Sequence, residues 1–293
     1  MKQTKKLRMS GIGGSDAAII CGISPWMTPL ELYKIKIGEV LSPDKTPSMH
    51  FGQKLERIVA EEYARRTGNK LKNDSKTYRH PDYSWMMAHI DRIVDGGKIL
   101  ECKTASSFSA DEWGESGTSD FPEYYRYQLQ HYMSVTGIAN ADIAVLIGGN
   151  DFRIFPVEKN EELIDHIIQK EKEFWECVQQ KREPEPMTLN DLKVKYPESV
   201  DKSIIAGLEI SDMIESYREI QKEIKAKEEI GEEMKFMLQN VMGDTEKIID
   251  RNGKKLISWK TQTRENLDIK KLKEEIPSVY EKYLVSSKIR VFR

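Results

Sequence analysis

The feature that most constrains the fold is a pair of strand-like runs joined by a short glycine turn. Met86–Val94 and Ile99–Thr104 are rich in apolar residues, and Asp95-Gly96-Gly97 lies between them. Two such runs joined through a short loop that contains glycine predict a β-hairpin. If the loop comprises residues 95–97, Asp91 stands directly opposite Glu101 on the neighbouring strand.

The side chains of this hairpin suit phosphodiester chemistry. Glu101 and Lys103 occupy alternate positions of one strand and therefore point to the same face. The carboxylates of Asp91 and Glu101, with Cβ atoms about 5 Å apart, would repel each other unless a cation lies between them. Oxygen ligands favour Mg²⁺ or Mn²⁺ over zinc, and the peptide carbonyl of Cys102 offers a further oxygen. Lys103 would then position the attacking water and offset charge on a phosphoryl oxygen.

A second interpretation of the same residues is a cluster of surface charges on an exposed hairpin. Charged residues make up 32% of the chain, so Asp, Glu and Lys match this spacing by chance. The distribution of charge is more informative than the net charge of −2. Residues 1–80 carry 15 Lys and Arg against 8 Asp and Glu, whereas residues 81–187 carry 10 against 20. This asymmetry suits a protein that holds a polyanion and divalent cations, and it equally fits ordinary surface variation.

The order of elements before residue 182 predicts an α/β fold. Four stretches with helical apolar spacing are separated by strand-like runs, and the first three of these stretches end at a glycine. They lie at about 28–37, 51–67, 122–136 and 161–180. A second hairpin is predicted from Ile143–Ile147 and Phe152–Val157, which flank Gly148-Gly149-Asn150. We therefore expect a central mixed sheet, mostly antiparallel, flanked by helices.

The last third of the chain has a different pattern. Glu183-Pro184-Glu185-Pro186 is typical of a linker, so we predict domains at residues 1–187 and 188–293. Apolar residues spaced by three and four from Ile210 to Val241 predict one helix of about 30–40 residues. Asn252-Gly253 predicts a further hairpin, and a charged helix is expected within 267–284.

Several classes of protein are disfavoured by composition. Mean hydropathy is −0.60, and no apolar run approaches the roughly 20 residues that a bilayer span needs. The basic N-terminus leads into a glycine-rich turn and not into a signal-peptide core. The three cysteines, Cys21, Cys102 and Cys177, are widely spaced and fit neither a disulfide framework nor a CxxC metal site. We expect a cytoplasmic protein without a membrane partner.

Four segments of the sequence, taken together and in order, resemble the phage lambda exonuclease and YqaJ-type viral recombinase family within the PD-(D/E)xK nuclease superfamily. The resemblance extends over roughly residues 7–182. The matching segments are Leu7–Ala17, Phe51–Glu56, Asp91 with Glu101-Cys102-Lys103, and Tyr127–Met133. It implies the PD-(D/E)xK core, a central mixed sheet flanked by helices, followed here by a C-terminal long helix and β-hairpin.

The resemblance also assigns roles to residues of the cleavage site. Asp91 and Glu101 match the metal-binding carboxylates, and Lys103 matches the catalytic lysine. Glu56 matches a helical glutamate that completes the active site, although by its own pattern it also fits a solvated glutamate. Gln128 matches a glutamine near the active site, where its amide would orient substrate or water.

A second set of residues matches the family's site for the 5′-terminal phosphate. Arg8 and Ser15 match phosphate-holding residues, and the glycine-rich turn between them also fits a simple capped turn. His89 stands where lambda exonuclease has a serine that contacts phosphate, and it fits a phosphate contact, a metal contact or a structural histidine. Ile90 replaces the proline of the superfamily's motif, which affects local strand geometry.

The resemblance implies a Mg²⁺-dependent exonuclease, with Mn²⁺ as a substitute, that digests one strand of linear double-stranded DNA from its 5′ end. Such an enzyme leaves 3′ single strands for a single-strand annealing recombinase, here in a bacterial host cell with a phage or prophage origin. Lambda-type members form a ring-shaped homotrimer, so a homo-oligomer is expected. Two alternatives are a catalytically silent DNA-binding or assembly protein, and a related nuclease with endonuclease or single-strand specificity.

Overall fold

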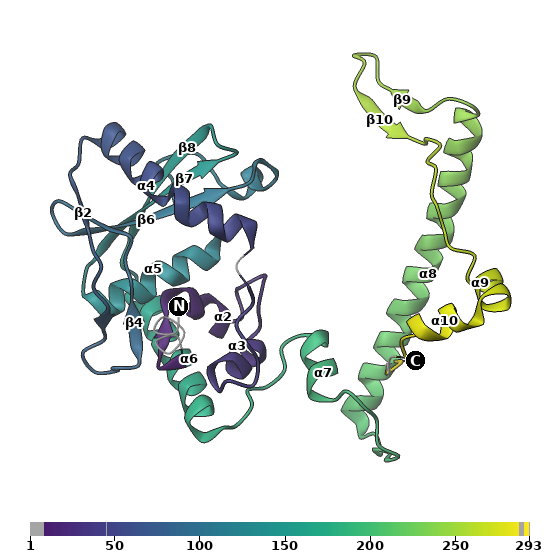
Figure 1. Ribbon diagram of the computed structural model, residues 1–293, viewed down its shortest axis with the longest axis horizontal. Helices are drawn as coiled ribbons and strands as arrows, with labels where there is room; N and C mark the ends of the chain where they lie inside the picture. The colour runs from purple at the N-terminus through teal and green to yellow at the C-terminus, as the bar shows by residue number, and fades with distance from the viewer. Residues whose placement is uncertain (1–8, 45, 287–289, 293) are drawn as a thin grey trace. The chain divides into compact units, whose positions relative to one another are not determined.

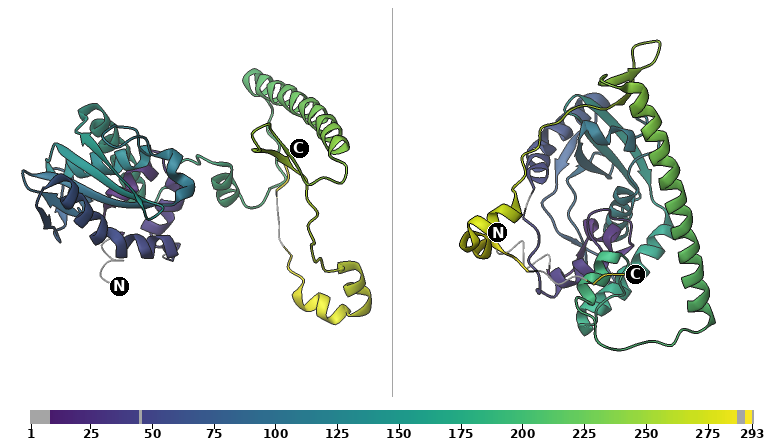
Figure 2. Two further views of the ribbon diagram at one scale, coloured as in Figure 1. Left: turned by 90° about the horizontal axis from the view of Figure 1, so that it is seen from above. Right: turned by 90° about the vertical axis from the view of Figure 1, so that its right-hand side faces the viewer.

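The computed structural model describes residues 9–44, 46–286 and 290–292 (Figures 1 and 2). The chain forms two compact units that divide between Pro197 and Glu198. Helix α7 (Leu189–Lys195) belongs to the first unit, where the Thr28 hydroxyl donates a hydrogen bond of 2.6 Å to Asp191. The predicted domain boundary after residue 187 stays a prediction.

The first unit is built on a five-stranded mixed sheet. Its strand order is β2-β5-β6-β7-β8, and only the central pair β6–β7 is parallel within this sheet. The bounds are β2 Leu71–Asn73, β5 Arg92–Val94, β6 Lys98–Ala105, β7 Asn140–Ile147 and β8 Asp151–Glu158. Both predicted hairpins, β5–β6 and β7–β8, are present, and the predicted mixed, mostly antiparallel sheet is confirmed.

A smaller sheet interrupts one of the predicted strands. It has the order β1-β4-β3, with β1 at Ile12–Gly13, β3 at Tyr78–Arg79 and β4 at Met86–Ala88. The prediction of one strand over Met86–Val94 was wrong, because β4 and β5 belong to different sheets. The strand breaks before Asp91, whose side chain takes the hydrogen bond of the Cys102 N–H.

Helices cover both faces of the large sheet. The helices are α2 (Gly14–Ile20), α3 (Pro29–Lys36), α4 (Pro47–Thr67), α5 (Glu123–Thr136) and α6 (Glu161–Gln180), with a 3₁₀ turn, η1, at Ser107–Glu112. Helices α4 and α5 end at Gly68 and Gly137, as predicted. Both glycines adopt positive φ, 72° and 75°, a conformation that glycine reaches without steric cost.

The two faces of β6 have different partners. Leu100 packs with Val59 of α4, whereas Ile99 packs with Leu129 of α5. Figure 1 shows α4 on one side of these strands and α5 on the other. Because side chains alternate along a strand, the odd-numbered residues Glu101 and Lys103 share the α5 face with Ile99.

The second unit contains α8 (Leu208–Met242), a hairpin of β9 (Lys247–Ile249) and β10 (Lys255–Ser258), and the short helices α9 (Ile269–Glu275) and α10 (Pro277–Tyr283). Helix α8 is one continuous rod, clearest in Figure 2. The long helix and hairpin are as predicted, but the single last helix was wrong. It is divided before Pro277, which lacks the N–H that a continuous helix needs there. No described helix is both long and apolar enough to cross a membrane.

Candidate active site

The β5–β6 hairpin places the two predicted metal carboxylates at its open end. Its register pairs Arg92 with Leu100, and extending this register by one residue places Asp91, which lies just outside β5, opposite Glu101. Gly96 and Gly97 in the turn have φ values of 95° and 86°, which side-chain-bearing residues rarely adopt. One carboxylate oxygen of Asp91 accepts a hydrogen bond of 2.9 Å from the main-chain N–H of Cys102. The expected opposition of the two carboxylates follows from this register.

Glu101 lies at the centre of a buried polar cluster between β6 and α5. Its side chain is 5% exposed, and its Oε1 accepts hydrogen bonds from Lys103 Nζ at 2.6 Å and from Gln128 Nε2 at 2.7 Å. The Gln128 carbonyl oxygen accepts a bond of 3.2 Å from Lys103, and its Nε2 also lies 2.9 Å from the Tyr132 hydroxyl. The structure therefore brings together three of the predicted site residues on two elements.

The second oxygen of Glu101 fits a metal ligand. Glu101 Oε2 is buried without a hydrogen-bond partner, and leaving a carboxylate oxygen so costs about 1–3 kcal/mol. Burial, and then the charge of Glu101, raise the pKa of Asp91 to about 8. A divalent cation bound by both carboxylates would remove both penalties. The donor set is hard oxygen, as Mg²⁺ and Mn²⁺ prefer.

The third predicted ligand, Cys102, would contribute its peptide carbonyl and not its thiol. The thiol is partly buried against the cluster that β6 forms with α4, and this burial raises its pKa well above the ordinary range. A neutral thiol is a poor ligand for a hard ion. Among the described residues, no three or more His, Cys, Asp and Glu side chains are grouped as a metal site. The fit therefore rests on two carboxylates with carbonyl or water oxygens.

Lys103 is held from two sides. Glu101 and Gln128 bond its ammonium group, and Nζ lies 4.5 Å from the centre of the Tyr125 ring. Burial alone would lower the pKa of Lys103, but the charge and hydrogen bond of Glu101, together with the nearby Tyr125 and Asp91, outweigh burial, and the pKa lies above its usual value. The side chain is therefore a fixed cation beside the carboxylates.

Glu56 reaches the site through a residue that the sequence did not single out. Its Oε1 accepts a bond of 2.7 Å from Arg92 Nη1, and the same nitrogen donates to the main-chain oxygen of Asp91 at 2.5 Å. Arg92 lies directly after Asp91 in sequence, but nothing in the local pattern indicates that its partner lies on α4. Tyr125 and Tyr132, which contact Lys103 and Gln128, also belong to the site, and no local pattern assigns them to it.

The predicted phosphate-binding residues are placed less completely. Arg8 lies outside the described residues. Ser15 is exposed in the first turn of α2, and the preceding turn is held by Lys36, which bonds the Gly11 carbonyl and the Asp16 carboxylate, each at 2.7 Å. His89 is exposed, and its ring nitrogen lies 2.9 Å from the Thr77 hydroxyl. A role of these residues in binding phosphate stays a prediction.

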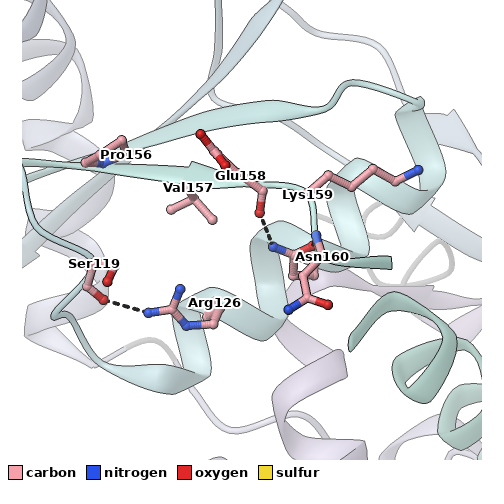
Figure 3. A pocket seen from close by; sticks show the side chains of 8 residues that line it. Ser119, Arg126, Pro156, Val157, Glu158, Lys159 and Asn160 are labelled. Carbon is pink, nitrogen blue, oxygen red and sulfur yellow. Dashed lines mark hydrogen bonds between the residues drawn. The ribbon is translucent and has the colours of Figure 1, made fainter. Parts of the chain in front are cut away.

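A separate hollow of about 570 Å³ lies beside the end of β8 and the start of α6 (Figure 3). Arg126 and Lys159 line it, and Figure 3 shows the Arg126 side chain directed to Ser119, whose carbonyl accepts its hydrogen bond at 2.6 Å. The residues around this hollow do not include Asp91, Glu101 or Lys103. The hairpin cluster and not this hollow carries the candidate chemistry.

Comparison with known proteins finds a family match over the part of the chain that contains the candidate active site. The profile of the YqaJ-like viral recombinase domain matches residues 5–139. The protein YqaJ of Bacillus subtilis (strain 168) is 37% identical over 295 residues, which cover 97% of this chain and 91% of that protein. The crystal structure of LHK-Exo, an alkaline exonuclease from Laribacter hongkongensis, superposes on this chain with a TM-score of 0.51 and 17% sequence identity. The superposed region covers 67% of this chain and 97% of the LHK-Exo chain. This likeness confirms the predicted fold, the PD-(D/E)xK core.

Proposed function

Because the chain belongs to the YqaJ-like viral recombinase family, we propose that it is a Mg²⁺-dependent deoxyribonuclease that digests linear double-stranded DNA from 5′ to 3′. The observation that carries the cleavage chemistry is the environment of Glu101. One of its carboxylate oxygens accepts hydrogen bonds from Lys103 and Gln128, and the other is buried without a hydrogen-bond partner. LHK-Exo, whose fold this chain shares, is an alkaline exonuclease that has also been crystallised with dAMP. The exonuclease activity of LHK-Exo supports the class of reaction proposed here.

The residues of the site divide the work of hydrolysis. Asp91 and Glu101 would hold Mg²⁺, which when bound would supply Lewis-acid activation of water and offset phosphodiester charge. Lys103 presents a fixed positive charge to the phosphoryl oxygens and holds the attacking water in place. One amide group, that of Gln128, holds Lys103 and Glu101 in a fixed relative position. Its carbonyl oxygen accepts a hydrogen bond from the lysine, and its Nε2 donates one to the glutamate.

The direction of digestion is the finer part of the proposal. It is supported by the match of Arg8 and Ser15 to a site for the 5′-terminal phosphate and by the positive balance of charge in residues 1–80, with His89 standing where lambda exonuclease has a phosphate-contacting serine. Under this proposal the products are 3′ single strands for an annealing recombinase in a bacterial host cell. A homo-oligomer, with a trimer favoured, would keep the enzyme on its DNA. Size-exclusion chromatography with light scattering checks the oligomeric state.

A degradation assay on linear duplex DNA with Mg²⁺ tests the function. We expect 5′-phosphorylated ends to be digested faster than 5′-hydroxyl ends, and Lys103→Ala and Asp91→Ala to lower kcat by at least about 10²-fold. Lys98→Ala on the same strand and Asp95→Ala in the same hairpin are matched controls that retain activity. Activity that survives Lys103→Ala and Asp91→Ala would remove the active-site assignment.

The same assay separates the two alternatives. Cleavage of circular duplex DNA at a rate similar to that of linear DNA would favour an endonuclease, and preferential digestion of single strands would favour a single-strand nuclease. Binding of DNA ends without cleavage at any Mg²⁺ or Mn²⁺ concentration would favour the catalytically silent DNA-binding protein.

A further inference from the structure

Arg92 joins α4 to the residue that carries the first metal carboxylate. Its Nη1 donates to Glu56 Oε1 at 2.7 Å and to the main-chain oxygen of Asp91 at 2.5 Å. The Arg92 side chain is 16% exposed and that of Glu56 is 32% exposed. A charge-assisted pair that is partly shielded from water is stronger than the median surface pair. The carboxylate of Glu56 is therefore balanced by a cation that belongs to the chain itself.

The sheet separates this pair from the Glu101 cluster. Arg92 is the register partner of Leu100, and cross-strand partners share a face, so the Arg92 side chain lies on the α4 face of the sheet. Glu101 is the next residue along β6 and lies on the opposite face, bonded to Gln128 of α5. Glu56 thus approaches the site from the far side of the sheet, with Arg92 between it and the Asp91 main chain.

The two glutamates differ in what they leave open. Glu101 has a buried oxygen without a partner, whereas Glu56 meets the guanidinium of Arg92. We propose that Arg92 takes the place of a second metal ion beside Glu56, so that the free protein binds one divalent cation, on Asp91 and Glu101. In this arrangement Glu56 is a positioning residue, which acts on Asp91 through Arg92 and is not itself a ligand.

This inference rests on the proposed function, and it is tested by metal binding and not by cleavage. Mn²⁺ binding to the full-length protein without DNA is measured by electron paramagnetic resonance, which counts free and bound ions. We expect one equivalent of bound Mn²⁺ in the natural chain. In Arg92→Gln, the freed carboxylate of Glu56 is expected to bring the count to two. In the double variant Arg92→Gln with Glu56→Gln, the count returns to one.

The chain offers a matched control for the loss of an arginine bridge. Arg66 bonds Glu62 of the same helix at 2.7 Å and the Phe152 carbonyl at 3.1 Å, which is the same pair of acceptor types. Arg66→Gln should leave one bound equivalent. Circular dichroism and unfolding curves show whether each variant is folded. Arg92→Gln and the double variant both lack the pair between Arg92 and Glu56, so a loss of stability from that pair affects their Mn²⁺ counts alike.

Each outcome decides between the two claims. Two equivalents of similar affinity in the natural chain, or a count of one in a folded Arg92→Gln, would overturn the role of Arg92 and leave the proposed nuclease intact. A count of two in the double variant would also overturn it, because the second ion would not depend on Glu56. No Mn²⁺ binding in the natural chain would instead overturn the metal-dependent function, and with it this role of Arg92.

Discussion

The ammonium group of Lys103 depends on an aromatic ring as well as on polar partners. Nζ lies 4.5 Å from the centre of the Tyr125 ring, and a desolvated cation–π contact stabilises by about 1–2 kcal/mol. Tyr125→Leu should therefore lower kcat by roughly five- to thirtyfold through a loosened lysine. Single-turnover digestion of duplex DNA measures the rate.

Tyr125→Phe is the control for that change, because it keeps the ring and removes only the hydroxyl. Its rate should stay within about twofold of the natural chain. An equal loss in both variants would assign the effect to the hydroxyl and contradict the proposed contact between ring and lysine.

At the residue scale, the sequence predicts the site where spacing alone decides geometry. Period-two alternation and the Gly96-Gly97 turn are enough to place Asp91, Glu101 and Lys103. The contact of Arg92 with Glu56 is different, because it joins residues 36 positions apart on different elements. Such a contact depends on how α4 packs on the sheet, and no local pattern reports that.

Helix α2 packs closely against α5, the helix that carries Gln128. A Cβ added at Gly14 would lie 2.3 Å from Cε1 of Tyr132, whose hydroxyl bonds Gln128. Gly14→Ala should lower the free energy of unfolding by about 1–3 kcal/mol, because the buried ring has to move. Urea unfolding measures the change.

Gly52→Ala is the matched control for this substitution. Gly52 lies within α4, and its added Cβ would meet Thr104 Oγ1 at 3.4 Å, an ordinary contact. It should leave stability unchanged or raise it by up to about 1 kcal/mol through helix propensity. A Gly14→Ala protein as stable as Gly52→Ala would contradict the tight packing of α2 on Tyr132.

A buried proton links α5 to α6. His131 Nε2 lies 3.0 Å from the Met87 carbonyl and must donate to it, so the 2.7 Å contact between Nδ1 and Glu171 requires a shared proton. Burial raises the pKa of Glu171. Burial alone would lower the pKa of His131, but the charge and hydrogen bond of Glu171, together with the Met87 carbonyl, raise it overall. The folded pair therefore keeps a proton that an unfolded histidine releases above about pH 6.5.

This pair makes stability depend on pH. A raised folded pKa contributes stability below the unfolded value that is lost as pH rises, so the free energy of unfolding should fall above about pH 6.5, by up to about 1.4 kcal/mol per pH unit. Glu171→Gln, whose amide donates to Nδ1 without a shared proton, should show a smaller fall. Urea unfolding at a series of pH values compares the two. Parallel curves would contradict the shared proton.

At the element scale, helix ends marked by glycine were predictable and the break between β4 and β5 was not. Gly68 and Gly137 end helices in the sequence and in the structure for the same reason, a positive φ that glycine reaches without steric cost. The break between β4 and β5 has no such marker. It depends on a side chain, Asp91, replacing backbone as the partner of Cys102, which is a property of the assembled sheet.

The whole molecule has an uneven distribution of buried surface. In the described part of residues 198–293, Met242 is the one buried side chain, whereas β7 is buried along most of its length. Helices without tertiary cover are marginally stable in water. In hydrogen–deuterium exchange of the full chain, amides of α8 should exchange much faster than those of β7.

Strong protection of α8 would contradict that prediction and indicate that the helix is covered in solution. The length and position of α8 were predictable because its apolar spacing is regular from Ile210 to Val241. The partner that covers the apolar face of α8 was not predictable, because an apolar stripe shows that a helix needs a packing partner but does not identify that partner.

The turn between β5 and β6 also limits how the length of this chain can vary over generations. One residue inserted or deleted between Asp91 and Glu101 would shift the register and send alternate side chains to the wrong face. The turn at Gly148-Gly149-Asn150 joins two strands that carry none of the candidate site residues, so a change of length there would disturb packing and not the spacing of the site. A change of length at the first turn is therefore expected to affect the chemistry directly, because the spacing there places the candidate site residues.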